Sequence, residues 1–328
     1  MKNKKIVIAG GSGFIGQAIA SYFGAENEIV ILTRGLPNSA NNAFGGSDID
    51  DAVKKNLRFV QWDNKNTGEW YKEIDGAEMV INLAGKSVNC RYTEKNKQEI
   101  FDSRTETTKA IGTAIQHAIV PPKLWVNAAS ATIYRHATDR AQDEYTGEIG
   151  NDFSVQVCKL WEKTFFDQRT PFTRKAALRM AVTLGNGGVI IPYLNLCKFG
   201  LGGRQGSGKQ MFSWVHAEDI CRAIAFLHDH ADIEGVYNVC SPNPVTNNIF
   251  MQTLRKVAGQ AFGLPAFVWM LKIGAALIGT ETELLLKSRW VLPTKLTEAG
   301  FAFKYEKLED AFKSIVSKLP RTRYHLFR

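Results

Sequence analysis

The sequence lacks the features of membrane-spanning and disulfide-bonded proteins. The apolar stretch at residues 266–279 is too short to cross a bilayer and contains Lys272, so we expect a packed helix there. The apolar run near the start is interrupted by four glycines, and we do not interpret it as a signal peptide. The five cysteines are scattered, without the spacing of a disulfide framework or a metal site. We therefore expect a cytoplasmic protein with reduced thiols and no contact with a membrane.

The sequence also has no cluster of metal ligands, no internal repeat and no nucleic-acid-binding motif. Among its six histidines, His228 and His230 are two residues apart, a spacing that points them to different sides of a helix. The net charge is +9, and residues 287–328 hold ten Lys and Arg against four Asp and Glu. We interpret this excess as a solvated basic face. Attraction of an anionic ligand or acidic partner is the alternative, and nucleic acid is the least expected partner.

What the sequence does contain is a regular alternation of strand-like and helical segments. Short, β-branched runs that are apolar on both faces are typical of parallel strands covered by helices. They occur at residues 5–10, 28–34, 57–62, 78–85, 124–130 and 175–185. Helical patterns lie between them, the longest at residues 93–118 and 152–167. This alternation predicts an α/β protein with a Rossmann-type, doubly wound parallel sheet.

The pattern changes after residue 184. Residues 185–208 are rich in glycine around one apolar helical stretch, and helices with few strand signals follow Pro242. A helical segment at 216–230 and a strand-like segment at 235–240 lie between these two regions. We therefore predict two parts. Residues 1–184 and 209–241 would form a Rossmann domain that binds a nucleotide, and residues 185–208 and 242–328 a smaller, mainly helical C-terminal lobe.

A glycine-rich loop follows the first strand-like segment and opens the first helix. Glycines in this loop permit a tight turn and let backbone N–H groups approach a pyrophosphate, whose charge the helix N-terminus favours. The order of strand, loop and helix is the context that this motif requires. We predict dinucleotide binding at Gly10, Gly13, Phe14, Ile15 and Gly16.

The end of the second strand indicates which dinucleotide binds. A carboxylate at this place would bind the 2′-hydroxyl of the NAD ribose, but the sequence has Thr33 and Arg34. A guanidinium there can pair with the 2′-phosphate of NADP in a forked geometry. We therefore expect NADP rather than NAD as the cofactor, and a surface arginine is the alternative interpretation.

Several longer motifs resemble a known family. NLAG at residues 82–85, ASATIY at 129–134 and WVHAEDICRA at 214–223 resemble the extended short-chain dehydrogenase/reductases. VCKLWE at 157–162 and VLPTKLTEAGFAFKY at 291–305 are similar to one epimerase-like branch of that family. The branch has a distinctive C-terminal domain of unassigned role, and some of its members are known as cell-division inhibitor homologues. The resemblance covers nearly the whole chain.

The resemblance implies further cofactor contacts along the chain. Thr33 and Arg34 would hold the adenosine phosphate, and Asp63 would lie near the adenine. Leu83, Ala84 and Gly85 would line the ribose and pyrophosphate. Glu99 and Arg104, on one helix, would face the cofactor, with a surface ion pair as the alternative, and Thr183 would lie near the nicotinamide.

The usual catalytic residues of the family are incomplete in this sequence. In the wider family a Ser or Thr after the fifth strand binds the substrate oxygen, a Tyr transfers the proton, and a Lys lowers the pKa of that Tyr. Ser130 matches the first, but Ser154 and Cys158 stand where the Tyr and Lys belong. Lys159 is rotated by about 100° along the helix and would point away. Tyr134 is the candidate proton donor, although a Tyr at this place is usually structural.

Two functional hypotheses follow. The first is an NADP-dependent oxidoreductase or epimerase-like enzyme that acts on an unidentified small-molecule carbonyl compound or sugar nucleotide through a rearranged proton path. Phe212 stands where sugar-nucleotide enzymes often have an Arg, and a glycine-rich loop with Arg204 and Lys209 can still bind an anion. The alternative is an NADP(H)-binding regulatory or scaffold protein that has lost catalysis. By analogy with the family, the helices at 93–118 and 152–167 would form the interface of a homodimer.

Overall fold

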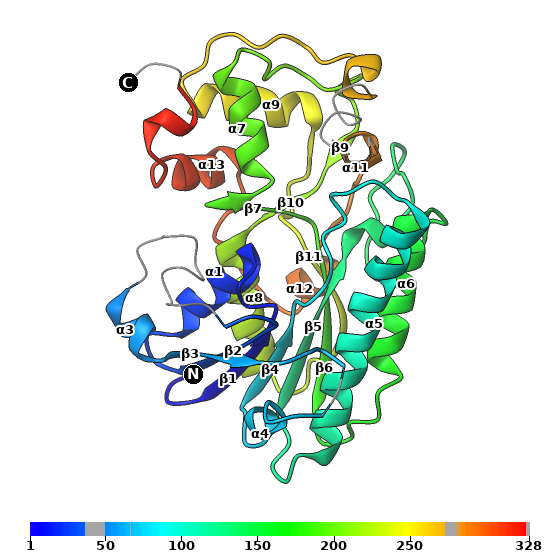
Figure 1. The fold of residues 1–328 in the computed structure, drawn as a ribbon. Helices are drawn as coiled ribbons and strands as arrows, with labels where there is room; N and C mark the ends of the chain where they lie inside the picture. The colour runs from blue at the N-terminus through cyan, green and yellow to red at the C-terminus, as the bar shows by residue number, and fades with distance from the viewer. Residues whose placement is uncertain (37–49, 66, 273–280, 282, 326–328) are drawn as a thin grey trace.

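A computed structural model describes residues 1–36, 50–65, 67–272, 281 and 283–325 (Figure 1). Within these ranges the centre is a seven-stranded sheet in the order β11–β6–β5–β4–β1–β2–β3, in which all adjacent strands are parallel. The strands are β1 Lys5–Ala9, β2 Glu28–Thr33, β3 Leu57–Gln61, β4 Met79–Asn82, β5 Leu124–Ser130, β6 Arg174–Met180 and β11 Gly235–Val239. The doubly wound α/β fold predicted from the sequence is confirmed.

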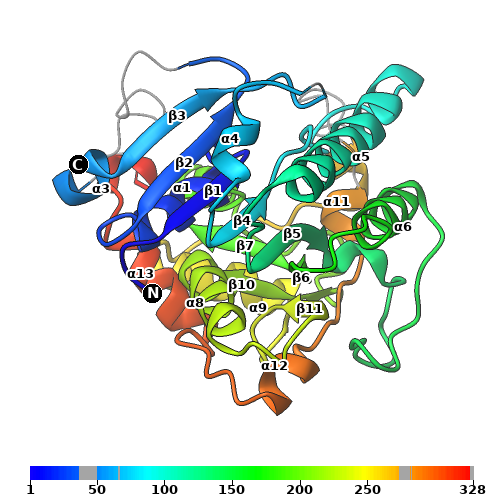
Figure 2. The same cartoon turned by 90° about the horizontal axis from the view of Figure 1, so that it is seen from below.

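The sheet is buried on both faces because side chains alternate along each strand. Ile6 and Ile8 of β1 belong to one core cluster, whereas Val7 and Ala9 belong to the other. Figure 2 shows the helices on the two sides of the sheet. The first face is covered by α1 (Phe14–Phe23), α3 (Asp51–Lys55) and α8 (Ala217–Asp229), and the second by α4 (Tyr71–Ile74), α5 (Glu94–His117) and α6 (Phe153–Phe166).

One predicted strand is two strands in the structure. The sequence predicts a single strand over residues 175–185, but the chain divides into β6 and β7 (Val182–Gly185) at Ala181, whose N–H donates to Val239 O. β7 leaves the main sheet and pairs with β10 (Trp214–His216) and β8 (Gly187–Gly188). The prediction is wrong because both halves are apolar, and composition alone does not show where the backbone changes sheets.

A third core cluster lies beyond the carboxyl ends of the central strands (Figure 1). Its helices are α7 (Ile190–Lys198), α9 (Asn247–Val257) and α13 (Leu308–Val316), and β9 (Met211–Phe212) pairs with β12 (Val245–Thr246) beside them. This C-terminal portion is mainly helical, as predicted. Leu296, Phe301 and Phe303 fall in the range assigned to that lobe but pack in the first cluster, against the central sheet. The predicted domain boundaries stay a prediction.

Residues 287–292 form an extended segment, which we call the C-terminal strap. On one side the N–H of Gln142 donates to Trp290 O at 2.8 Å, and on the other the N–H of Arg289 donates to Met211 O at 2.8 Å. The strap therefore joins three parts of the chain that are far apart in sequence. The short elements around it and at the chain end are η1 (Ala131–Ile133), α11 (Glu283–Leu286), α12 (Thr294–Glu298) and η2 (Arg321–Arg323).

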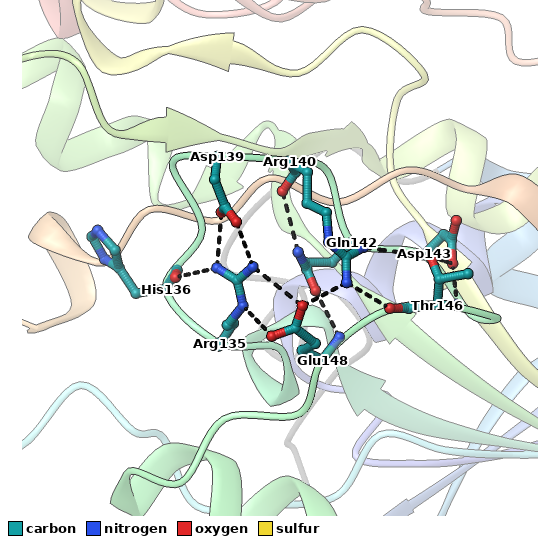
Figure 3. Close-up of polar contacts among 8 residues, drawn as sticks. All are labelled: Arg135, His136, Asp139, Arg140, Gln142, Asp143, Thr146 and Glu148. Carbon is teal, nitrogen blue, oxygen red and sulfur yellow. Dashed lines mark hydrogen bonds and ion pairs between the residues drawn. The ribbon is translucent and has the colours of Figure 1, made fainter.

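The loop that receives the strap is held by its own ion pairs (Figure 3). Arg135 binds Asp139 and Glu148 at N–O distances of 2.8 Å, and Arg140 binds Glu148 at 2.6 Å. The buried side chain of Gln142 accepts the N–H of Glu148 at 2.6 Å. Single exposed ion pairs contribute little, but a network of several fixes a loop more effectively. Gln142 is thus held in place for its backbone contacts with the strap.

No helix in the described ranges is long and apolar enough to cross a bilayer. The packed helix predicted at residues 266–279 lies partly outside the described residues. Within its described part, Phe267, Val268, Trp269 and Met270 are exposed rather than packed.

Candidate functional site

A cavity of about 860 Å³ opens where β1, β2 and β4 end. Ligands of open α/β sheets bind at this edge, because the loops after neighbouring parallel strands meet there. The volume falls in the range of pockets that enclose small ligands and cofactors. The lining residues are Gly10, Ser12, Gly13, Leu32, Thr33, Arg34, Gly35, Trp62, Asn64, Lys65, Leu83, Ala84, Gly85, Lys86, Ser87, Glu99, Asp102, Ser103, Glu106 and Thr107.

The glycine loop forms the floor of the cavity and admits no side chain at two positions. Gly10 has φ +76°, and a Cβ there would lie 2.9 Å from the backbone nitrogen of Ala84. A Cβ on Gly16 would lie 2.4 Å from Cα of Gly11, so this glycine lets α1 pack directly on the loop. Both contacts are far shorter than a carbon side chain tolerates, which is the physical reason for glycine here.

The N-terminus of α1 faces the cavity without a side-chain cap. Gly13 is the N-cap residue, lines the cavity and makes no side-chain hydrogen bond to the helix. Phe14, Ile15 and Gly16 form the first turn, whose N–H groups have no partner within the helix and favour an anion. The Phe14 ring points away and packs on the β7–β8 turn, where a Cβ on Gly185 would lie 2.7 Å from its Cζ. The loop therefore fits a pyrophosphate through its backbone.

The end of β2 supplies a cation to the cavity. Arg34 lines the cavity, and no acidic side chain within the described residues forms an ion pair with it. Thr33 Oγ1 donates to Gly35 O at 2.9 Å and shapes the turn. Lys65 lies on the same side and forms an ion pair with Glu106 at 3.2 Å. A phosphate group at this end of the cavity would meet two cations.

Asp63 is exposed and does not line the cavity, although Trp62 and Asn64 on either side of it do. Its Oδ1 accepts the N–H of Lys65 at 3.0 Å. The carboxylate thus shapes the turn after β3, and its predicted place near the adenine stays a prediction.

The loop after β4 is shaped by a buried asparagine. Asn82 donates to Asn127 Oδ1 at 2.8 Å and accepts the N–H of Ala84 at 3.1 Å. This fixes the backbone of Leu83, Ala84 and Gly85, which all line the cavity, and their predicted contacts with the ribose and pyrophosphate stay a prediction. Asn82 itself was not among the predicted site residues, and its position in the NLAG motif was the available signal.

One face of α5 forms a wall of the cavity. Glu99 lines it and forms an ion pair with Lys86, whose hydrogen bond lowers the pKa of Glu99. Its predicted contact with the cofactor stays a prediction. Arg104 does not line the cavity, because its Nη1 donates to Lys86 O at 3.1 Å and to Ile100 O at 3.0 Å. Its guanidinium also lies 5.0 Å from the ring centroid of Trp161. The lining residues that sequence analysis missed on this helix are Asp102, Ser103, Glu106 and Thr107, and their helical spacing from Glu99 could have found them.

The two predicted catalytic residues differ in their surroundings. Ser130 ends β5, and its Oγ accepts the N–H of Thr132 at 3.2 Å. Tyr134 is 2% exposed, donates to Asn238 Oδ1 at 3.0 Å and accepts from Arg179 Nη1 at 2.9 Å. Burial raises the pKa of Tyr134. These contacts favour a structural role for Tyr134, and its role as proton donor stays a prediction without a contact that supports it.

The remaining predicted positions lie outside the cavity lining. Thr183 is in β7, and its Oγ1 donates to Ala181 O at 3.3 Å. Burial raises the pKa of the Cys158 thiol to about 12, so this residue is not a nucleophile at neutral pH. Phe212 packs on Phe250, with ring centroids 4.2 Å apart, and belongs to the third core cluster. Arg204 donates to the carbonyl groups of its own loop.

No group of three or more His, Cys, Asp or Glu in the described part of the chain could hold a metal ion.

Comparisons with known proteins agree with this architecture. Residues 6–155 match the NAD dependent epimerase/dehydratase family, and residues 265–315 match a domain of unknown function, DUF1731. The chain is 31% identical to the epimerase family protein YfhF of Bacillus subtilis, over 95% of this chain and 98% of that protein. It is 30% identical to the chloroplastic SDR39U1 homologue of Arabidopsis thaliana, over 95% of this chain and 86% of that protein.

Among solved structures, the human epimerase family protein SDR39U1 with NADPH superposes with a TM-score of 0.81 at 26% identity, covering 96% of this chain and 99% of that one. A UDP-N-acetylglucosamine 4-epimerase of Methanobrevibacter ruminantium has a TM-score of 0.74 at 17% identity, covering 97% and 98%, and shares the fold. The 31% identity to YfhF over 95% of the chain, together with the two matched segments, shows that the chain belongs to the NAD dependent epimerase/dehydratase family and ends in a DUF1731 domain.

Proposed function

We propose that this protein is an NADP(H)-dependent oxidoreductase or epimerase-like enzyme that acts on a hydroxyl or carbonyl group of a small molecule. The observation that carries the choice of NADP(H) is Arg34, which lines the cavity at the end of β2 without an acidic partner in the described chain. A carboxylate at this place would repel the 2′-phosphate, whereas a guanidinium can bind it with two hydrogen bonds. The human relative with NADPH supports the same choice.

Residues of this chain would hold the cofactor in a defined order. Arg34 and Lys65 would bind the 2′-phosphate, and the first turn of α1 would bind the pyrophosphate. The backbone of Leu83 to Gly85 would follow the ribose toward the nicotinamide. When bound, the cofactor supplies or accepts a hydride. Ser130, at the end of β5, would bind the substrate oxygen.

Replacing Arg34 with alanine tests the cofactor choice. We expect the Kd for NADPH to rise by about 10- to 100-fold, because a hydrogen bond to a charged group contributes about 1.5–3 kcal/mol. The Kd for NADH, which lacks the phosphate, should change less than about twofold. Isothermal titration calorimetry of both cofactors at one salt concentration measures this.

Arg321→Ala is the matched control, because the substitution removes the same charge. Arg321 is exposed in η2, far along the chain from the cavity residues. It should leave both Kd values unchanged. A loss of NADPH affinity equal to that of Arg34→Ala would mean that general electrostatic attraction, not the site, selects the cofactor. Equal binding of NADPH and NADH by the unmodified protein would refute the proposal of NADP(H).

The predicted homodimer remains part of this proposal. α5 and α6 lie side by side at one edge of the molecule in both views (Figures 1 and 2). Leu160 and Phe166 of α6 are 41% and 37% exposed, so this helix presents apolar side chains outward. Analytical ultracentrifugation of the Leu160→Glu variant and of the unmodified protein tests the homodimer. The buried carboxylate that the substitution introduces should shift the dimer toward the monomer.

A further inference from the structure

A phenol stands beside the position at which α6 lacks its tyrosine. Ser154 is 9% exposed, and its Oγ lies 3.5 Å from Oη of Tyr92. Tyr92 precedes α5, so it reaches this place from a different element of the fold. The small serine side chain leaves room for that hydroxyl at the start of α6. The site therefore has a phenol there, although α6 does not supply it.

The ring of Tyr92 is fixed by aromatic packing. Its centroid lies 4.7 Å from that of Phe153, which in turn lies 5.5 Å from Phe101 of α5. Burial raises the pKa of Tyr92, so its hydroxyl is protonated at neutral pH. A positioned and protonated phenol is a group that general acid catalysis uses.

Residues of the DUF1731 segment hold Tyr92 and face it. Glu281 Oε1 accepts the backbone N–H of Tyr92 at 3.1 Å. Glu283 interacts with Ser154, and its buried Oε1 accepts no hydrogen bond from the described residues. A buried carboxyl oxygen without a partner is costly in free energy. A hydroxyl of a bound substrate would supply the missing hydrogen bond, so this oxygen points to a polar ligand.

Hydrogen bonds connect the start of α6 with Ser130. The N–H of Thr132 donates a hydrogen bond to Ser130 Oγ at 3.2 Å. The carbonyl oxygen of Thr132 accepts a hydrogen bond from Lys287 Nζ at 3.0 Å. The same Nζ lies 2.7 Å from Oδ2 of Asp152, the N-cap residue of α6. The two sides of the site are therefore held in one network, and the C-terminal strap supplies its central cation.

A second cation, Arg104, lies beside the cofactor cavity. A Cβ on Gly85, a lining residue, would lie 3.3 Å from Cζ of Arg104. The guanidinium of Arg104 interacts electrostatically with Tyr92 and with Cys158. Arg104 therefore links the surroundings of Tyr92 with the wall of the cofactor cavity.

We propose that Tyr92 is the proton donor of this site, in place of the tyrosine that α6 lacks. The inference rests on the proposed function, since it needs a nicotinamide near the ends of β4 and β5. In carbonyl reduction the bound cofactor would supply a hydride, with both electrons, to the carbonyl carbon. Tyr92 gives the proton of Oη to the carbonyl oxygen, so the product is an alcohol. The phenolate left on Tyr92 regains a proton from water.

The test follows tyrosine ionisation through the ultraviolet band of the phenolate, with and without NADP⁺. The positive nicotinamide ring beside Tyr92 should lower the pKa of one tyrosine by about one unit or more. The ionisable groups that face Tyr92 are Cys90, Glu281, Glu283, Arg104 and Arg289, and none of them absorbs in this band. We expect the shift to disappear in Tyr92→Phe while NADP⁺ still binds.

Tyr145→Phe is the matched control, because Tyr145 is 61% exposed and bonds to Glu298, away from the cavity residues. It should retain the shift. If NADP⁺ binds and Tyr92→Phe shows the same shift as the unmodified protein, Tyr92 is not at the nicotinamide and the inference is wrong. If NADP⁺ does not bind at all, the proposed function fails and this inference fails with it. Failure of the inference alone would leave NADP⁺ binding intact, so the two failures are distinguishable.

A rescue experiment separates a catalytic role from a structural one. With benzaldehyde as the probe carbonyl, we expect Tyr92→Phe to lower kcat for NADPH oxidation by about 100-fold with little change in KM. Adding Ser154→Tyr returns a phenol to α6 and should recover part of kcat. Equal kcat in Tyr92→Phe and the unmodified protein would overturn the proposal. Loss of kcat without recovery, together with a lowered melting temperature of Tyr92→Phe, would also overturn it, in favour of a packing role.

Discussion

Replacing Arg179 with methionine is expected to lower the free energy of unfolding by about 3–5 kcal/mol, because it leaves a buried carboxylate without its partner. Arg179 and Glu162 form two N–O contacts of 2.7 Å, and their side chains are 12% and 10% exposed. Arg179 also donates to the hydroxyl of Tyr134. This ion pair connects α6 to β6, so its loss should loosen the contact between them. Urea denaturation followed by circular dichroism measures the change.

Lys163→Met is the matched control on the same helix. Lys163 pairs with Asp167, but their side chains are 69% and 58% exposed, and an exposed pair of this kind contributes about 0.3–0.5 kcal/mol. The double variant Arg179→Met with Glu162→Met should recover most of the lost stability, since it removes the unpaired charge. A single Arg179→Met variant as stable as Lys163→Met would contradict a buried, structurally important pair.

Acidification is expected to destabilise the protein through His216 by about 3 kcal/mol at most, and mainly between pH 6.5 and 4. Burial lowers the pKa of His216 from 6.5 to about 4 in the folded state, although Glu218 acts in the opposite direction. Between these two values the unfolded chain binds a proton that the folded protein does not. Stability therefore falls as the pH falls through this window, and above it His216 contributes no pH dependence.

His216→Asn isolates this contribution. His216 is the N-cap residue of α8, where Nδ1 accepts the N–H of Glu218 at 3.2 Å, and Asn can also accept that bond. The variant loses the packing of the ring on Tyr305, whose centroid lies 3.9 Å away, so it should be less stable at pH 7.5. It should nevertheless lose about 2–3 kcal/mol less than the unmodified protein between pH 7.5 and 4.5. The same loss in both proteins would show that His216 is protonated in the folded state.

The cavity at the ends of β1, β2 and β4 could be predicted from the sequence because its signals are local. Gly10, Gly13 and Gly16 are close together and follow a strand, and Arg34 directly follows the next strand. Backbone geometry explains Gly10 and Gly16, where a Cβ would lie 2.9 Å and 2.4 Å, respectively, from the nearest backbone atom, and such geometry is encoded within a few residues. The parallel sheet was predictable for the same reason, since its alternation of apolar runs and helices needs no knowledge of long-range contacts.

The surroundings of Tyr92 could not be predicted because they depend on contacts between distant residues. Tyr92 and Ser154 are 62 positions apart in the sequence, and no spacing links them. Glu281 and Glu283 reach Tyr92 only because the DUF1731 segment folds back onto the start of α6. Tyr134 was a reasonable candidate from its position after β5, but sequence alone does not show that Asn238 and Arg179 already bind its hydroxyl.

The C-terminal strap also sets the order of events on the ribosome. Its Ser288 donates to Ala137 O across 151 positions of sequence. At 5–20 residues per second, the strap is synthesised roughly 8–30 s after the loop that receives it. Until then the nascent chain already has the glycine loop, β1 to β6 and α5, but lacks Lys287 beside Thr132 and Asp152. An emerging polypeptide can thus form the cavity at the ends of β1, β2 and β4 long before the contacts of Lys287 are made, and translation itself separates the two.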